Sequence, residues 1–198
     1  MVAIIGLGNP GRRYAETRHN VGYFVADVLA AKLKCRFAPG KGEYVTGVCS
    51  LRDNEVLIVK PVTYMNDSGI AVAEIVQAHG VALDQLLVVV DDFQIPLGSL
   101  RMRASGSDGG HNGLASIIYH LQSDAFPRLR CGIGSEAMPQ DKTLMADFVL
   151  SEFEGSEKPV VEEMVHRAVD ACTSFVADGI EKTMSVFNRK GEEAGDER

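Results

Sequence analysis

The chain has 198 residues, of which 45% are hydrophobic and 24% charged, and its formal net charge is −7. These proportions are those of one globular domain and exclude a fibrous or disordered chain, and the acidic balance argues against a general nucleic-acid binder, since phosphate contacts need basic residues. No apolar run approaches the roughly 20 residues that span a bilayer. The four cysteines are scattered without a Cys-x-x-Cys pair, which favours reduced thiols. We therefore expect a cytoplasmic protein that does not enter a membrane.

The amino-terminal stretch is the one around which the other elements are arranged. Residues 2–5 have the length and composition of a buried strand, and a glycine-rich loop over 6–11 follows. Apolar residues at helical spacing then predict an amphipathic helix over 21–33. We expect Asn9 at the end of the strand and His19 at the mouth of the helix, where side chains point over a sheet edge into a cleft.

The rest of the chain predicts alternating strands and helices. In chain order these are a β-hairpin over 44–50 and 55–60 with a turn at Asp53-Asn54, a helix over 70–79 closed by Gly80, a buried strand over 86–90, a strand over 99–103, a flexible loop over 105–110, a helix over 114–121 capped by Asn112, a strand over 128–133, and a long helix that Ser156 caps and Gly179 follows. The strand over 86–90 is the best candidate for the centre of the sheet, and it delivers Asp91 and Asp92 at its carboxyl end.

Alternating strands and helices indicate an α/β fold. We find no repeat or linker, so we expect one domain over residues 1–190, built around a mostly parallel or mixed sheet. Residues 191–198 are mostly acidic and glycine-rich. We expect them to form a solvated, disordered tail.

The loop after the first strand matches the dinucleotide-binding pattern Gly6-x-Gly8-x-x-Gly11. In that fold the third glycine begins a helix and an acidic residue ends the second strand. Here Arg12 to His19 intervene before the amphipathic pattern, and Cys35-Arg36-Phe37 stands where the acidic residue belongs. A tight turn explains the glycines equally well, so a nicotinamide-dependent oxidoreductase is a minor alternative.

A second pattern consists of amides, histidines and a carboxylate near the ends of predicted elements: Asn9, Asn66, Asn112, His19, His111 and Asp91. Side-chain amides both donate and accept hydrogen bonds, which suits recognition of ester or peptide groups. A histidine backed by a carboxylate suits general-base catalysis on water. The alternative is that Asn20, Asn66 and Asn112 are only helix N-caps. We find no nucleophile elbow and no spacing typical of a metal site.

These residues fall in four motifs through which the chain resembles bacterial-type peptidyl-tRNA hydrolases over about residues 2–190. The motifs are Asn9-Pro10-Gly11-x-x-Tyr14-x-x-Thr17-Arg18-His19-Asn20, Met65-Asn66-x-Ser68-Gly69, Asp91-Asp92 and Gly109-Gly110-His111-Asn112-Gly113-Leu114. The resemblance implies a single α/β domain with a twisted mixed sheet flanked by helices. It also implies hydrolysis of the ester that links a peptide to tRNA, by a monomer that uses no metal or cofactor.

The resemblance also implies a role for individual residues. His19 would be the base that activates water, Asp91 would hold its ring, and Asn9 would test whether the α-amino group of the substrate is acylated. The groove for the peptide and the tRNA 3′ end would be lined by Tyr14, Tyr64, Asn66 and Asn112, with His111 nearby. The tRNA 5′ phosphate would be held by Arg103 and Arg130, with Lys142 at another basic position.

A non-catalytic function is the main alternative, because relatives of this fold in plastids act as RNA-splicing partners that bind RNA and protein. The presence of His19, Asp91 and the asparagines favours the enzyme. We therefore expect an esterase whose partner is peptidyl-tRNA, bound through its 3′ acceptor end and its 5′ phosphate.

Overall fold

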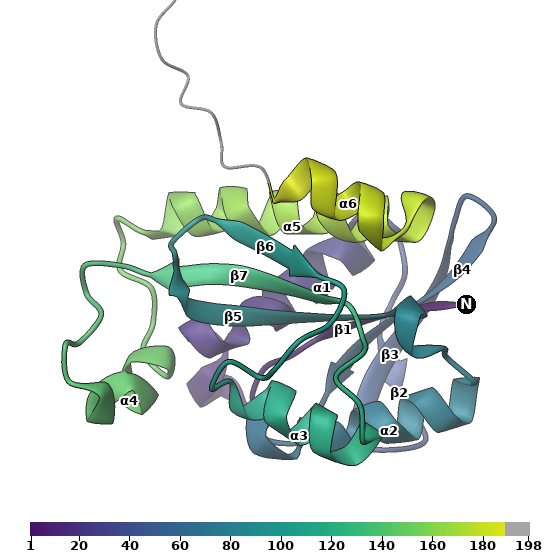
Figure 1. Ribbon diagram of the computed structural model, residues 1–198, viewed down its shortest axis with the longest axis horizontal. Helices are drawn as coiled ribbons and strands as arrows, with labels where there is room; N and C mark the ends of the chain where they lie inside the picture. Colours follow the sequence, from purple (N-terminus) through teal and green to yellow (C-terminus); the bar gives the residue numbers. More distant parts are fainter. Residues whose placement is uncertain (189–198) are drawn as a thin grey trace, which may run out of the picture.

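The computed structural model describes residues 1–188, with the exception of the side chain of Lys142. The acidic tail expected over 191–198 therefore lies outside the described residues. The described part of the chain forms one seven-stranded sheet with helices on both faces (Figure 1). Its strands are β1 (Val2–Gly6), β2 (Ala38–Pro39), β3 (Tyr44–Leu51), β4 (Asn54–Pro61), β5 (Leu86–Pro96), β6 (Leu100–Arg103) and β7 (Arg128–Gly134).

The strand order β2-β3-β4-β1-β5-β7-β6 confirms the predicted α/β class and makes the sheet mixed. Strands β4, β1, β5 and β7 are parallel neighbours, whereas β2, β3 and β6 pair antiparallel at the two edges. Strand β1 and the first seven residues of β5 are buried throughout. Both are apolar runs covered on two faces, as expected of central parallel strands.

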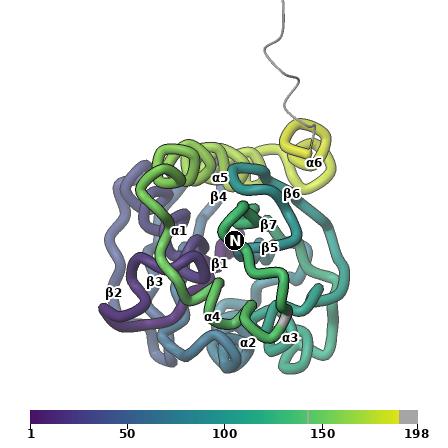
Figure 2. Tube along the Cα trace, turned by 90° about the vertical axis from the view of Figure 1, so that its left-hand side faces the viewer, coloured from purple at the N-terminus to yellow at the C-terminus, as the bar shows by residue number. Residues whose placement is uncertain are grey.

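The helices lie in two layers. They are α1 (Val21–Lys32), α2 (Ser68–His79), α3 (Asn112–Leu121), α4 (Met145–Val149), α5 (Lys158–Asp178) and α6 (Ile180–Phe187). Figures 1 and 2 show α5 and α6 above the sheet and α2 and α3 below it. Helix α1 packs with α5 in the upper core. No helix of the described chain is long and apolar enough to cross a membrane.

Five short 3-10 turns connect these elements: η1 (Arg12–Tyr14), η2 (Arg18–Asn20), η3 (Met65–Asp67), η4 (Leu83–Gln85) and η5 (Lys142–Leu144). The hairpin and the helix closed by Gly80 are confirmed, although the hairpin turn is at Arg52-Asp53 and the helix begins at Ser68. Strand β2 and helices α4 and α6 were not predicted.

Three expected element ends were wrong. Strand β5 does not end before Asp91 but continues through it to Pro96, because β7 pairs alongside. Helix α3 is capped by the side chain of His111, not Asn112, and the N-cap position of α5 is Glu157, not Ser156.

The glycines of the amino-terminal motif allow α1 to approach β1. A Cβ atom on Gly6 would lie 2.1 Å from the carbonyl oxygen of Gly22, and one on Gly22 would lie 2.4 Å from backbone atoms of Leu7. Helix α1 begins at Val21, well after Gly11. The helix N-terminus therefore does not follow the glycine loop as a dinucleotide site requires.

The carboxyl end of α6 is tied to the edge strand β6. Asn188 accepts a hydrogen bond from the N–H of Met102 at 2.7 Å and donates one to the carbonyl oxygen of Met102 at 2.9 Å. One side chain thus occupies both hydrogen-bonding groups of that strand residue.

Candidate active site

Two adjoining cavities lie beyond the carboxyl end of β1 and beside Asp91 and Phe93 of β5. One, of about 270 Å³, is lined by Asn9, Tyr14, His19, Tyr64, Met65, Asn66, Asn112, Ala146, Val149 and Leu150. The other, of about 150 Å³, is lined by His19, Asp91, Phe93, Gly110, His111, Asn112, Met145, Ala146 and Val149. All eight residues expected to act in catalysis or to line the substrate groove therefore meet here, at the edge where open α/β sheets bind ligands.

Two histidines share one oxygen of Asp91. Nδ1 of His19 lies 2.7 Å from Oδ1 of Asp91, and Nε2 of His111 lies 3.1 Å from the same atom. Asp91 is 3% exposed and His19 is 8% exposed. The two imidazole rings lie 5.0 Å apart, so they form one cluster around the carboxylate.

The hydrogen bonds determine which nitrogen of each ring carries the proton. An ionised carboxylate only accepts, so Nδ1 of His19 and Nε2 of His111 both donate to Asp91. Nδ1 of His111 accepts the N–H of Leu114 at 3.2 Å, which is the cap of α3. His19 is left with an unprotonated Nε2 that can accept a proton, whereas both nitrogens of His111 are engaged.

The pKa values of His19 and Asp91 shift in opposite directions. Burial alone would lower the pKa of His19, but the charge and the hydrogen bond of Asp91 outweigh burial and raise it. Burial would raise the pKa of Asp91, yet the two histidines lower it. Asp91 therefore stays ionised at neutral pH, and protonated His19 is stabilised by the carboxylate beside it.

Asn9 is held in one orientation by its neighbours. Its Oδ1 accepts the N–H of Met65 at 2.8 Å. Its backbone N–H donates to Oδ1 of Asn20 at 2.8 Å, and its carbonyl accepts from Nδ2 of Asn20 at 3.0 Å. Because the oxygen of the Asn9 amide is engaged, the side chain presents its Nδ2–H₂ donor group to the cavity.

The asparagines are not helix caps. Asn20 stands at the N-cap position of α1 but its side chain holds Asn9, Asn66 lies inside η3, and Asn112 is the first residue of α3. Both Asn66 and Asn112 are exposed along the first cavity. Asn20 thus occupies the expected N-cap position without a capping side-chain hydrogen bond, whereas the expectation that Asn112 caps α3 was wrong.

Two tyrosines flank the opening of this cavity. The rings of Tyr14 and Tyr64 meet edge to face with centroids 6.3 Å apart. Tyr64 is 57% exposed. The guanidinium of Arg13 lies 5.7 Å from the centroid of Tyr14. Exposed aromatic faces beside a cation are suited to stacking on nucleotide bases.

A cluster of arginines lies on the neighbouring strands β6 and β7. Arg103 and Arg101 are exposed and pair in register with Arg128 and Arg130. Arg130 forms an ion pair with Asp92 at 3.2 Å, next to Asp91 in the chain. Arg130 also lies against Gly109, whose neighbour Gly110 lines the second cavity.

Arg128 has a structural role instead. It is 1% exposed and donates hydrogen bonds to the carbonyls of Gly106 and Ser107. Burial and the nearby charge of Arg130 lower the pKa of Arg128 to about 10. Arg130 donates to the carbonyl of Asp108 as well. The loop expected to be flexible is thus tied to β7. Lys142 begins η5, and its side chain lies outside what the structure describes.

Donor atoms of His19, Asp91 and His111 lie within 4.8 Å of one another, which is close enough for three ligands of one metal ion. A neutral imidazole that binds a metal through Nε2 carries its proton on Nδ1. In His111 that proton would meet the N–H of Leu114, which Nδ1 now accepts. The cluster therefore does not fit a metal while the cap of α3 is formed.

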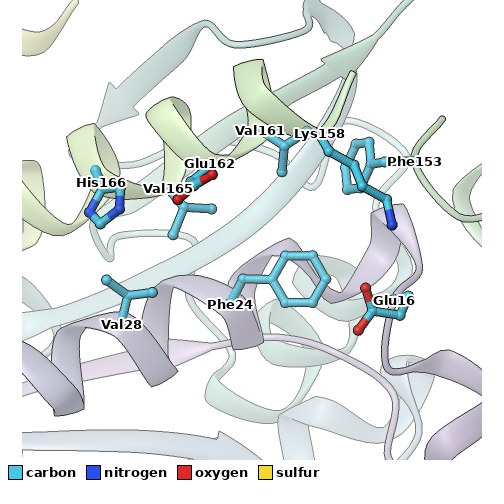
Figure 3. A pocket seen from close by; sticks show the side chains of 9 residues that line it. All are labelled: Glu16, Phe24, Val28, Phe153, Lys158, Val161, Glu162, Val165 and His166. Atoms are coloured by element: carbon cyan, nitrogen blue, oxygen red, sulfur yellow. The ribbon is translucent and has the colours of Figure 1, made fainter. Parts of the chain in front are cut away.

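Two further cavities contain none of the predicted catalytic or substrate-binding residues. One of about 690 Å³ continues the second cavity, with which it shares Phe93, Gly110 and Met145. The other, of about 270 Å³, lies between α1 and α5 and contains none of the predicted site residues (Figure 3).

Comparison with known proteins identifies the family. The sequence model described as peptidyl-tRNA hydrolase matches residues 3–195. The chain is 44% identical to the peptidyl-tRNA hydrolase of Chlorobaculum parvum over 96% of this chain and 98% of that protein. It is 42% identical to that of Geobacillus thermodenitrificans over 95% and 100%. The crystal structure of the Acinetobacter baumannii peptidyl-tRNA hydrolase superposes with a TM-score of 0.89 at 31% identity, covering 95% of this chain and 94% of that one.

The chain belongs to the peptidyl-tRNA hydrolase family. This confirms the resemblance drawn from the four motifs, and the oxidoreductase alternative was wrong. Several apolar residues line the second cavity and its continuation but lie outside the four motifs of the peptidyl-tRNA hydrolase family. The sequence did not predict them as site residues; examples are Phe93, Met138 and Met145. Nor did it identify the buried pair formed by Arg18 and Glu157. No local pattern marks these residues, because segments distant in sequence bring them together.

Proposed function

We propose that this chain hydrolyses the ester of peptidyl-tRNA with His19 as the general base, and so releases free tRNA and peptide. The observation that carries the proposal is the pairing of His19 with a buried carboxylate, which leaves Nε2 unprotonated beside a cavity lined by amides. Membership of the peptidyl-tRNA hydrolase family supplies the substrate.

The reaction needs only a positioned water and one base. Nε2 of His19 takes a proton from the water as its oxygen attacks the ester carbonyl carbon. Asp91 stabilises the imidazolium that forms, and the imidazolium returns the proton to the departing ribose oxygen. One general base supplies about 10²- to 10⁴-fold, and side-chain amide donors that face the developing oxyanion add to this. An aminoacyl ester is reactive enough that no covalent nucleophile is required.

Asn9 selects acylated substrates. Its Oδ1 is engaged by Met65, which supports a role for Nδ2 as a donor to the carbonyl oxygen of the first peptide bond. A free α-amino group has no such carbonyl and is also charged. Peptidyl-tRNA is thereby separated from aminoacyl-tRNA.

The remaining residues hold the two ends of the substrate. Tyr14, Tyr64, Asn66 and Asn112 bind the peptide and the 3′ end of the tRNA, with His111 beside them, and their common cavity supports this. The 5′ phosphate is held by Arg103 and Arg130, and Lys142 supplies a further positive charge. The exposure of Arg103 on β6 supports its part in the grip.

Two broader expectations belong to the same proposal. The enzyme acts as a monomer, as the resemblance carried by the four motifs implies. It works in the cytoplasm, in keeping with its four free cysteines. A non-catalytic RNA-binding role is not favoured, because it gives the His19–Asp91 pair no task.

The test is hydrolysis of N-acetylated aminoacyl-tRNA beside its unacetylated counterpart, with wild type and His19→Ala in parallel. We expect rapid cleavage of the acetylated substrate only, a loss of about 10²- to 10⁴-fold in kcat for the variant, and unchanged tRNA affinity. A folded wild-type protein that binds tRNA and cleaves neither substrate would refute the proposal.

A further inference from the structure

Arg18, the residue before the proposed base, is 1% exposed. Its guanidinium donates to both oxygens of Glu157, from Nη1 to Oε1 at 3.1 Å and from Nη2 to Oε2 at 2.6 Å. Nε donates to Oγ of Ser151 at 3.3 Å. The arginine therefore makes a two-pronged ion pair in the interior, the geometry that only a guanidinium gives.

Two aromatic rings enclose the same guanidinium. Its central carbon lies 4.6 Å from the centroid of Phe148, on α4, and 4.8 Å from that of Phe153. Figure 3 shows Phe153 beside Lys158 at the start of α5. Because the charge is stacked as well as paired, the orientation of Arg18 is fixed on several sides.

Backbone contacts join the same two segments. The N–H of Arg18 donates to the carbonyl of Ser151 at 2.9 Å, and Thr17 forms a β-bridge with Glu152. Glu157 is itself held, since its Oε2 accepts the N–H of Glu154 at 2.8 Å. The chain just before His19 is therefore fastened to the segment that connects α4 with α5.

The helix that precedes this segment lines the candidate site. Helix α4 contributes Ala146 and Val149 to both cavities beside His19. Arg18 and His19 are consecutive residues of the three-residue turn η2, so a shift of the backbone at Arg18 also displaces His19. Arg18 faces Glu157 on one side of the turn, and His19 faces Asp91 of β5 on the other.

We propose that the Arg18–Glu157 ion pair is a positioning device that sets the ring of His19 against Asp91 and fixes α4 beside it. The inference rests on the proposed role of His19. Folding stability alone does not explain the pair, because replacing a buried ion pair with apolar residues of similar volume often leaves the free energy of unfolding unchanged or increases it. The two parallel hydrogen bonds join residues that are 139 positions apart in the sequence, so they fix the position of η2 relative to the start of α5.

The first variant is Arg18→Lys, which keeps the charge and loses the fork and the stacking. We expect kcat on N-acetylated aminoacyl-tRNA to fall about 10- to 100-fold, since an error of about 1 Å in placing a reacting group costs on that order, with KM changed less than kcat. The imidazole signal of His19, followed by NMR, should titrate at a lower pH than in wild type because its contact with Asp91 is weakened. Arg18→Met should lose more than Arg18→Lys.

The matched control is Val169→Ala, a truncation of a buried core residue of α5 that lines neither cavity beside His19. It should lower the melting temperature and leave kcat and the titration of His19 unchanged, so lost stability alone does not imitate the effect. Should Arg18→Met not fold, Arg18→Lys decides alone.

The outcomes separate the two proposals. An Arg18→Lys protein that is folded, with wild-type kcat and an unmoved His19 titration, would show that the ion pair is only structural and overturn the inference. A shifted titration with unchanged kcat would support the positioning of the ring and count against His19 as the base.

Discussion

Nδ1 of His19 lies 2.7 Å from Oδ1 of Asp91, and the same oxygen accepts a second hydrogen bond from His111. One buried carboxylate thus orients two rings, but only one of them retains a nitrogen that can accept a proton. The second ring is committed at both nitrogens, to Asp91 and to the N–H of Leu114. This asymmetry supports His19, rather than His111, as the proposed base.

Asp91→Asn keeps the shape of the side chain and removes its charge. We expect kcat to fall about 10²- to 10⁴-fold, because the amide neither stabilises the imidazolium nor fixes the proton on Nδ1. Initial rates on N-acetylated aminoacyl-tRNA measure this. Asp92→Asn is the control: Asp92 faces Arg130, so kcat should stay near the wild-type value. Equal losses in both variants would contradict the assignment.

The pH–rate profile should have one limb from His19. The base must be neutral to act, so log(kcat/KM) should rise with pH and level off at an inflection above the ordinary histidine value of about 6.5, because Asp91 raises the pKa of His19. In Asp91→Asn the inflection should move to lower pH. An inflection below 6 in wild type would show that another group controls the rate.

Stability should depend on the same two groups. A raised pKa means that protonated His19 adds stability that is fully present below pH ~6.5 and is lost as pH rises through its folded-state pKa. The lowered pKa of Asp91 means that its contribution is present above pH ~3.9 and is lost in acid. Urea unfolding midpoints across pH measure both, and His19→Ala should flatten the upper part of the curve.

Arg103→Ala should weaken tRNA binding with little change in kcat. Loss of one phosphate contact reduces the slope of log K against log salt by roughly one. Arg52→Ala, an exposed arginine in the hairpin turn between β3 and β4, is the matched control and should leave affinity and slope unchanged. Normal binding by Arg103→Ala at every salt concentration would remove Arg103 from the phosphate grip.

Asn9→Asp tests recognition of the acylated amino group. The substitution replaces the donor Nδ2 with a second oxygen, so it should reduce kcat/KM for the N-acetylated substrate by about 10-fold or more, since a buried acceptor is left unpaired or repelled. The free aminoacyl substrate should be affected less, which lowers the ratio of the two rates. An unchanged ratio would show that another group reads acylation.

Much of the fold was readable because the central strands are continuous apolar runs and the helices carry clear periodicity. The end of β5 could not be predicted from the sequence, because two consecutive aspartates usually mark the end of a strand. The strand continues beyond Asp91 and Asp92 because it pairs with β7 there. Helix α4 has five residues and β2 has two, which is too short for a periodic signal. Their existence depends on tertiary contacts.

The candidate site was predictable as a set of residues but not as a set of contacts. The motifs gave His19, Asp91 and the asparagines. Whether an asparagine caps a helix or holds a neighbouring loop depends on partners elsewhere in the chain, as the pairing of Asn9 with Asn20 and Met65 shows. Arg18 and Glu157 are 139 residues apart, and sequence spacing cannot join them.

The hydrogen bonds between Asn188 and Met102 occupy backbone groups at one edge of the sheet. An exposed edge strand invites the strand of another molecule to pair with it. Here β6 is such an edge, and its outward arginines make it the proposed approach for RNA. By satisfying the donor and the acceptor of Met102, one asparagine withholds backbone groups from a second sheet while the arginine side chains on either side stay open to phosphate. This edge therefore offers fewer free backbone groups to a strand of another molecule, while Arg101 and Arg103 remain exposed.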